Sequence, residues 1–303
     1  MNLFTQKTAP NYGGQALIEG VLIRGVTAIS VAIRRPDGSI FVTTEQIGWK
    51  WAKRLRTIPL IRGTIVLAEM MTLGTKALML SAKVAIEEDD EQEETLSSMA
   101  IGITLFTSLF LSIGLFFILP TVATNFVDSN YQTTNISSNL IEGIIRLVLF
   151  IGYLVAISLS KDVRRIFQYH GAEHMTVHAY ENKRELTINN IKDYPTPHPR
   201  CGTAFLLVVL IIAISVHVLW TPPVLWERIV SRIILIPIIT GISYEIIKWS
   251  SNYSSFKLMK LIIAPNLWLQ SLTTRQPDDS QIEVALHAMN GAIEADRLST
   301  VND

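Results

Sequence analysis

Charge and cysteine are both scarce in this chain of 303 residues. Charged residues make up 17% of the sequence and hydrophobic residues 49%, with a mean hydropathy of +0.33, whereas soluble domains carry about 25% charged residues. This composition excludes a disordered chain and argues against a purely soluble enzyme. Basic and acidic residues number 26 each, so the bulk charge predicts no nucleic-acid partner. A single cysteine, Cys201, excludes an intrachain disulfide.

Long apolar segments predict a mainly α-helical membrane protein with about four transmembrane helices in two hairpins. Residues 95–127 contain no charged side chain, and a bilayer core needs only about 20 helical residues. Residues 201–226 form a second uncharged run. Two weaker spans, at about 140–160 and 229–247, carry Arg146 and Arg232 near their starts, where an arginine side chain can reach the membrane interface.

The distribution of basic residues gives an orientation. Segments 1–98, 161–202 and 248–303 hold 23 of the 26 lysines and arginines, and the loop 128–139 between the first two spans holds none. The positive-inside rule therefore places both termini and the 161–202 loop in the cytoplasm. Cys201 would then be reduced, which is consistent with either a ligand or a buried thiol.

The stretches outside these spans predict a small N-terminal β unit and further helices. Strands at 28–34 and 39–44 flank a Pro36-Asp37-Gly38 turn. Residues 60–86 read as an amphipathic helix that lies at the interface or is tightly packed, with a fifth membrane span as the alternative. The predicted units are 1–58 (β unit), 59–94 (amphipathic helix and acidic linker), 95–160 (first hairpin), 161–202 (site segment), 203–248 (second hairpin) and 249–303 (cytoplasmic helical segment).

Chemically unusual residues are concentrated between positions 161 and 203. His170-Gly171-Ala172-Glu173-His174 is an H-x-x-E-H pattern, and His178 and Glu181 follow it. On a helix the three histidines form one stripe, with the two glutamates beside it. Neighbouring histidines lie about 6 Å apart and can share one metal ion, whereas His170 and His178, about 12 Å apart, cannot.

Two metal sites therefore compete. In the first, His170 and His174 bind the ion and Glu173 is the general base, as in inverzincin-like peptidases. In the second, His174 and His178 bind it, with Glu181 as a ligand or a supporting carboxylate. Either set lacks one or two ligands of a tetrahedral zinc site. These could come from the later segment His198-Pro199-Arg200-Cys201, in which Arg200 is also suited to hold an anionic group.

With these residues in hand, the chain resembles the YqhQ-like family, a domain of unknown function found in bacterial multi-pass membrane proteins that are often described as metal-dependent enzymes. The resemblance rests on stretches at 13–25, 169–181, 198–203, 241–245 and 272–285. It implies an integral membrane protein whose functional residues are His170, Glu173, His174, His178, Glu181, His198, Arg200 and Cys201. It supplies no substrate.

The leading hypothesis is a membrane hydrolase that depends on a divalent transition metal, with zinc favoured by the histidine and cysteine donors. Glu173 and Arg200 would be the catalytic side chains, and the location favours a lipid-linked or membrane-protein substrate. The alternative is a scaffold or assembly factor in which a structural metal or a His/Glu network holds the cytoplasmic parts together. Transport is a weaker third possibility. Glu19 and Arg24 of the β unit are candidates to reach the site.

Overall fold

The computed structural model describes residues 12–47, 54–86, 98–131, 133–219, 225–252 and 257–301. Its strands are β1 (Gly13–Leu17), β2 (Gly20–Arg24), β3 (Ala28–Arg34) and β4 (Ile40–Gln46). The helices before the site are α1 (Ile61–Val84), α2 (Ser98–Ile113), the π-helical turn η3 (Gly114–Ile118), α3 (Leu119–Tyr131) and α4 (Asn135–Ile157). The remaining helices are α5 (Lys161–Glu181), α6 (Ile188–Lys192), α7 (Gly202–Leu219), α8 (Leu225–Asn252), α9 (Lys257–Thr273) and α10 (Asp279–Val301).

The N-terminal β unit is an antiparallel sheet with the strand order β1-β2-β3-β4. Both predicted strands are present, and the turn between them has Gly38 at φ +86°, a conformation that glycine adopts without strain. Alternate residues on β2 face opposite layers, because Val21 packs towards α5 and α10 whereas Leu22 packs towards α1. The sheet therefore lies between α1 on one face and α5 with α10 on the other.

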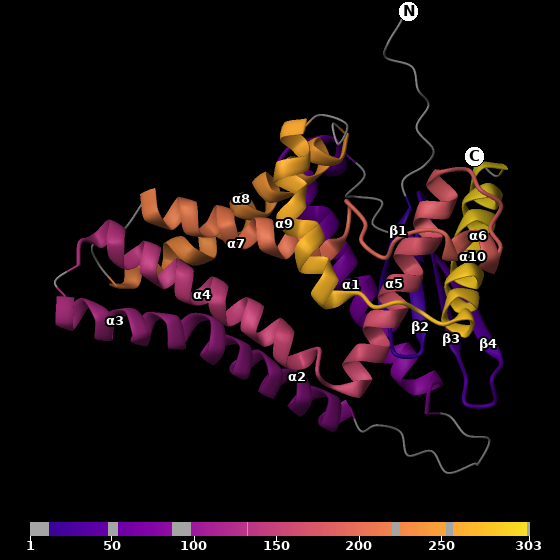
Figure 1. Cartoon of the computed structure of the whole chain (residues 1–303), viewed down its shortest axis with the longest axis horizontal. Helices are drawn as coiled ribbons and strands as arrows, with labels where there is room; N and C mark the ends of the chain where they lie inside the picture. Colours follow the sequence, from indigo (N-terminus) through magenta and orange to yellow (C-terminus); the bar gives the residue numbers. More distant parts are fainter. Residues whose placement is uncertain are drawn as a thin grey trace, which may run out of the picture.

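Helices α2, α3, α4, α7 and α8 extend away from the sheet in one direction, whereas α1 lies beside it (Figure 1). Within the described residues, three helical segments are long and apolar enough to cross a membrane, namely Ile61–Val84, Gly102–Tyr131 and Asn135–Ile157. The first predicted hairpin matches the last two of these. The second predicted hairpin corresponds to α7 and α8, but the apolar part of α7, Phe205–Leu219, is shorter. The number of candidate spans therefore differs from the prediction of four, and the acidic run at 87–94 lies outside the described residues.

Helix α1 buries one of its charges, pairs another, and exposes much of its apolar surface. Glu69 is 1% exposed and accepts hydrogen bonds from Arg24 on β2 and from Arg56. Near the start of the helix, Arg62 pairs with Glu245 on α8. Large apolar residues point outwards instead, including Met71, which is 64% exposed. This helix is packed against both the sheet and α8, and its outer face is suited to lipid contact.

A polar contact lies at the centre of the first hairpin. Pro120 has no N–H to donate to the carbonyl four residues earlier, which is that of Phe116. Arg146 on α4 supplies a donor in its place, with 2.9 Å between its Nε and the Phe116 oxygen. Glu142, one turn earlier on α4, accepts a hydrogen bond of 2.5 Å from the same guanidinium. Arg146 therefore lies in the middle of α4, whereas the sequence predicted a position near the start of the span. Glu142 neutralises the arginine there.

Candidate metal centre

Helix α5 carries the predicted histidine stripe between two layers of the protein. One side packs on β1 and α10 through buried residues such as Tyr169, Ala172 and Met175. The other side, with His170, His174 and His178, faces α9 and the loop that leads to α7. Gly171 allows a close approach of the segment after α9, since a Cβ there would lie 2.1 Å from the Arg275 carbonyl oxygen. The three histidines thus share one side of the helix, as their spacing predicted, and the structure shows that this side faces backbone carbonyls.

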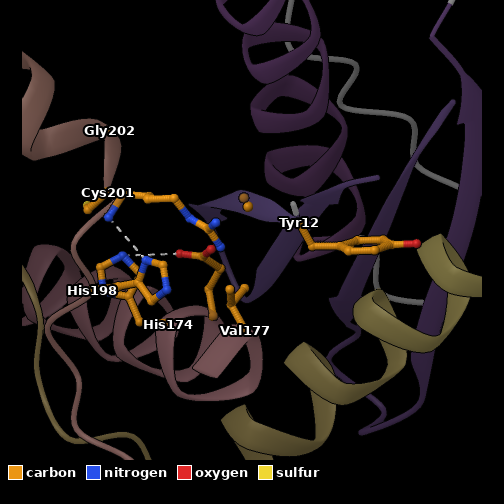
Figure 2. A pocket seen from close by; sticks show the side chains of 10 residues that line it. Tyr12, His174, Val177, His198, Cys201 and Gly202 are labelled. Atoms are coloured by element: carbon orange, nitrogen blue, oxygen red, sulfur yellow. Dashed lines mark hydrogen bonds and ion pairs between the residues drawn. The ribbon is translucent and has the colours of Figure 1, made fainter. Parts of the chain in front are cut away.

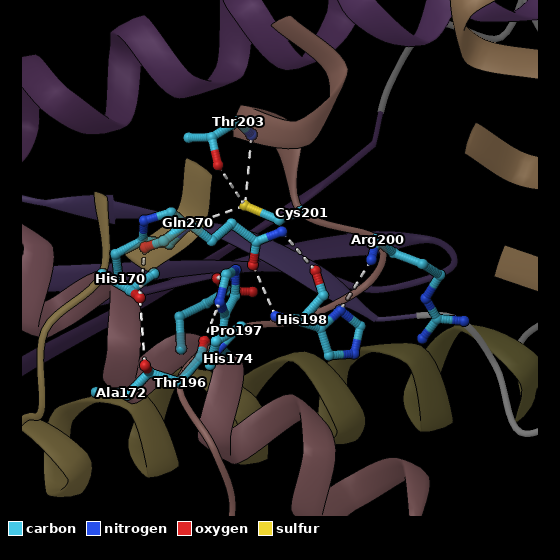
Figure 3. A network of polar contacts seen from close by, with 12 residues as sticks. His170, Ala172, His174, Thr196, Pro197, His198, Arg200, Cys201, Thr203 and Gln270 are labelled. Atoms are coloured by element: carbon cyan, nitrogen blue, oxygen red, sulfur yellow. Dashed lines mark hydrogen bonds and ion pairs between the residues drawn. The ribbon is translucent and has the colours of Figure 1, made fainter. Parts of the chain in front are cut away.

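Three donor atoms converge beside this helix. His170, His174 and Cys201 each offer one atom, and all three atoms lie within 4.8 Å of one another. The His170 Nε2 and the Cys201 Sγ are 3.2 Å apart (Figure 3). In a tetrahedral zinc site, bonds of about 2.0–2.3 Å keep the ligand atoms roughly 3.5 Å apart. The widest spacing, 4.8 Å, therefore needs to shorten by about 1.3 Å to close around an ion.

Backbone carbonyls fix the tautomers of both histidines. The Nδ1 of His170 is 2.8 Å from the Thr273 oxygen, and the Nδ1 of His174 is 2.5 Å from the Thr196 oxygen. A carbonyl oxygen only accepts, so each Nδ1 carries the proton and each Nε2 has its lone pair free. This arrangement, in which the other ring nitrogen donates to a carbonyl, is the usual support of a metal-bound histidine.

Cys201 lies immediately before α7, close to two polar groups of Thr203. Its Sγ is 3.4 Å from the Thr203 N and 3.0 Å from the Thr203 hydroxyl. A cysteine binds a metal ion as its thiolate. The donor set of two imidazoles and one cysteine sulfur therefore fits a transition metal, and zinc in particular.

Glu173 borders a small cavity next to these donors. Its carboxylate is buried, with Oε2 3.4 Å from the His174 Nε2. Burial raises the pKa of Glu173, although charge on His170 and His198 and a hydrogen bond from the Gly14 N–H act in the opposite direction. The cavity has a volume of about 30 Å³ and is lined by residues that include Gly14, Glu173, His174, His198, Arg200 and Cys201 (Figure 2). It is large enough for one water molecule.

The other predicted residues form a second group further along α5. His178 donates from Nε2 to the Pro197 oxygen at 2.9 Å, and burial lowers its pKa to about 4. Glu181, the last residue of the helix, forms an ion pair with Arg200. The His198 Nε2 lies 3.4 Å from the Glu181 Oε2. Among the described residues, the first predicted ligand pair thus joins Cys201 in one donor group, whereas His178, Glu181 and His198 remain outside it.

Several supporting residues were not identified from the sequence. Gln270 on α9 is fully buried and brackets His198, accepting from its N–H at 2.7 Å and donating to its carbonyl at 2.9 Å. The nearby Thr273 carbonyl fixes His170. In the sequence, these residues are marked by a mainly polar stretch, Gln270 to Thr274, at the end of an apolar helix.

The β unit reaches the site through its backbone and not through the two side chains proposed for this role. Gly14 on β1 packs directly against Glu173, and a Cβ there would lie 3.1 Å from the Glu173 Cγ and 2.1 Å from the Leu22 oxygen. Glu19 instead contacts Arg165 and Tyr169 on α5, and Arg24 contacts Glu69. Both candidates were therefore wrong, since each side chain is already engaged in an ion pair elsewhere.

Comparison with known proteins supports the resemblance seen in the sequence. Residues 58–295 match the family described as "Protein of unknown function (DUF1385)". The chain belongs to this family. It is also 35% identical to the "Uncharacterized protein YqhQ" of Bacillus subtilis (strain 168), over 98% of this chain and 96% of that protein. The family match covers α5, the loop that carries His198 and Cys201, and α9. No solved structure matches the chain.

Proposed function

We propose that this member of the DUF1385 family is a metal-dependent membrane hydrolase. The observation that carries the proposal is the convergence of the His170 Nε2, the His174 Nε2 and the Cys201 Sγ beside a water-sized cavity. Catalytic zinc sites have three protein ligands and an open fourth position. The described donors supply three ligands, and the cavity lies where a fourth would be occupied by water or substrate.

Glu173 is the general base in this proposal. When bound, a zinc ion supplies a Lewis acid that polarises the carbonyl or phosphoryl group and makes water more acidic. Glu173 accepts the proton of the attacking water and then delivers it to the leaving group. Its buried position raises its pKa, which brings the carboxylate closer to the range in which it can both accept and return a proton near neutral pH.

The membrane placement is supported by the apolar helices and the charge distribution. Three helical segments of the described residues are long and apolar enough to cross a bilayer, and the basic residues favour a cytoplasmic position for both termini and the 161–202 segment. A site at the membrane surface favours a lipid-linked or membrane-protein substrate.

A test of the reaction compares Glu173→Gln with the wild-type protein in detergent. We expect the variant to keep its zinc and to lose hydrolysis of ester and phosphoester substrates, assayed with chromogenic probes and with a lipid extract. Hydrolysis at the wild-type rate by zinc-loaded Glu173→Gln would remove Glu173 as the base.

The alternative is a structural metal site in a scaffold protein. A structural site has four protein ligands and no open position, and the nearest further donors are Glu173 and His198. X-ray absorption spectroscopy of the zinc-loaded protein separates the two functions. Three protein ligands with an additional light-atom ligand support the hydrolase, whereas a closed set of four protein ligands supports the scaffold.

A further inference from the structure

Arg200, Glu181 and His198 form a polar cluster next to the three candidate ligands. Arg200 and His198 both line the cavity. The Arg200 side chain points away from Cys201 (Figure 3), so its guanidinium lies apart from the candidate ligand atoms. This group carries chemistry that metal binding does not use.

Glu181 is shared between the two other members of this cluster. Its carboxylate forms an ion pair with the Arg200 guanidinium, and its Oε2 lies 3.4 Å from the His198 Nε2. The His198 Nδ1 accepts a hydrogen bond from the Arg200 N–H at 3.3 Å. The imidazole proton is therefore on Nε2, which faces Glu181 as a donor. Glu181 thus has a second partner available if it leaves Arg200.

The two glutamates of α5 differ in their freedom to move. The Glu173 side chain is 5% exposed and is enclosed by β1, whereas the Glu181 side chain is 28% exposed and belongs to the last residue of the helix. Lys183, two residues later, has a left-handed φ of +54° that ends the helical path. A carboxylate at a helix end can change rotamer without disturbing the packed helix.

We propose that Arg200 binds an oxyanion group of the substrate, a phosphate or a carboxylate, and that Glu181 is a resident carboxylate which this group displaces. A guanidinium presents a planar pair of donors that matches both oxyanions. On displacement, Glu181 turns to the His198 Nε2–H, which has no hydrogen-bond partner among the described residues, so the carboxylate stays paired and the imidazole gains an acceptor. The proposal deepens the proposed function by naming the substrate class, and it rests on that function in placing the substrate in this cavity.

Calorimetric titration of the detergent-solubilised protein with inorganic phosphate tests this assignment. Loss of charged hydrogen bonds in Arg200→Gln should weaken phosphate binding about tenfold or more, and Arg200→Lys should give an intermediate loss. Glu181→Gln removes the competing charge and should tighten binding several-fold. Arg184→Gln and Glu185→Gln, which change the same charges on the exposed segment after α5, should bind as the wild type does.

Three probes separate the sources of the oxyanion. Inorganic phosphate, acetate and dihexanoyl phosphatidic acid are compared, with dihexanoyl phosphatidylcholine as the control for the lipid chains. Tighter binding of phosphatidic acid than of phosphate identifies a lipid headgroup, whereas equal affinity identifies recognition of the oxyanion alone, and both results support the proposal. It is overturned if Arg200→Gln binds phosphate as well as wild type, if Glu181→Gln weakens binding, or if Glu181→Gln shows no saturable binding of any probe.

The zinc content of the same samples distinguishes this proposal from the proposed function. Phosphate binding that depends on Arg200 in a protein without zinc would overturn only the hydrolase. If the protein binds zinc but its phosphate affinity is the same in Arg200→Gln and wild type, only the present assignment is overturned.

Discussion

The His170 Nε2 lies 3.2 Å from the Cys201 Sγ, although the two residues are 31 positions apart in the chain. The imidazole proton is on the other nitrogen, which donates to the Thr273 carbonyl. Without a metal, the contact is made by the thiol proton. A metal ion takes the place of that proton, because metal binding requires a deprotonated thiol and releases a proton.

The thiol chemistry of Cys201 gives the first prediction. It is the single cysteine of the chain, so a maleimide label reports on this site alone. We expect slow labelling of the zinc-loaded protein in detergent and faster labelling after zinc is removed with a chelator, since the thiolate is the reactive form and coordination occupies it. Cys201→Ser is the unlabelled control. Equal labelling rates with and without zinc would show that Cys201 is not a ligand.

The second prediction concerns Gln270, which holds the loop that carries His198. Replacement by leucine leaves the buried N–H and carbonyl of His198 without their partners, at a cost of about 1–3 kcal/mol each in unfolding free energy. We expect Gln270→Leu to lower both thermal stability and zinc affinity, because Thr196, which orients His174, belongs to the same loop. Ser271→Ala, on the exposed side of α9, is the matched control. Unchanged zinc affinity in a destabilised Gln270→Leu protein would limit Gln270 to a structural role.

The contact between Arg146 and the Phe116 carbonyl predicts a specific rescue. Arg146→Leu removes the guanidinium that neutralises the buried Glu142 carboxylate, and breaking a buried ion pair typically costs about 3–5 kcal/mol. The Arg146→Leu/Glu142→Leu double variant removes both charges and should recover much of this loss. Pro120→Ala should recover a further part, because alanine restores an N–H for Phe116. Unfolding in detergent measures these effects, and strictly additive losses in the combined variants would contradict the account.

Asp296 predicts how stability depends on pH. Burial alone would raise its pKa, but hydrogen bonds from Thr27, Val26 and Tyr12 outweigh this effect and lower the pKa below its ordinary value of 3.8. A carboxylate with a lowered pKa in the folded state contributes stability above its unfolded pKa and loses it as the pH falls through the folded pKa. Asp296→Asn should therefore be less stable than wild type at pH 7, and the difference should shrink below about pH 4.

Thermal unfolding of both proteins between neutral and acid pH checks this prediction. The difference between the two melting temperatures isolates Asp296 from other titrating groups. A difference that stays constant down to the lowest pH would show that the charge of Asp296 does not matter.

Local patterns predicted much of the fold and of the site. The period of the His170–His178 stripe identified α5 and its buried face, and the turn residues around Gly38 identified the β3–β4 hairpin. Cys201 lies beside His170 and His174, the position expected for it because cysteine and histidine are the usual zinc ligands, and its role as a ligand stays a prediction.

Long-range packing decided what the sequence left open. The pattern on α5 is equally compatible with a His170–His174 pair and a His174–His178 pair. The choice depends on where α7 begins, which places Cys201 beside the first pair. Gln270 supports the backbone of His198, although the two residues are 72 positions apart. A contact over this distance in the chain cannot be predicted from the helical periodicity of the sequence. Charges on α1 were likewise read as a polar stripe, but Glu69 is buried because β2 and the segment before α1 supply arginines.

Metal analysis of the purified protein in detergent tests the central claim most directly. We expect about one zinc ion per chain in wild type, and loss of that zinc in His170→Ala, His174→Ala and Cys201→Ala. His178→Ala should keep the metal, as should His287→Ala on the exposed side of α10. Loss of zinc in His178→Ala with retention in His170→Ala would support the other ligand pair. Absence of metal from the wild type after reconstitution with zinc would contradict the metal centre itself.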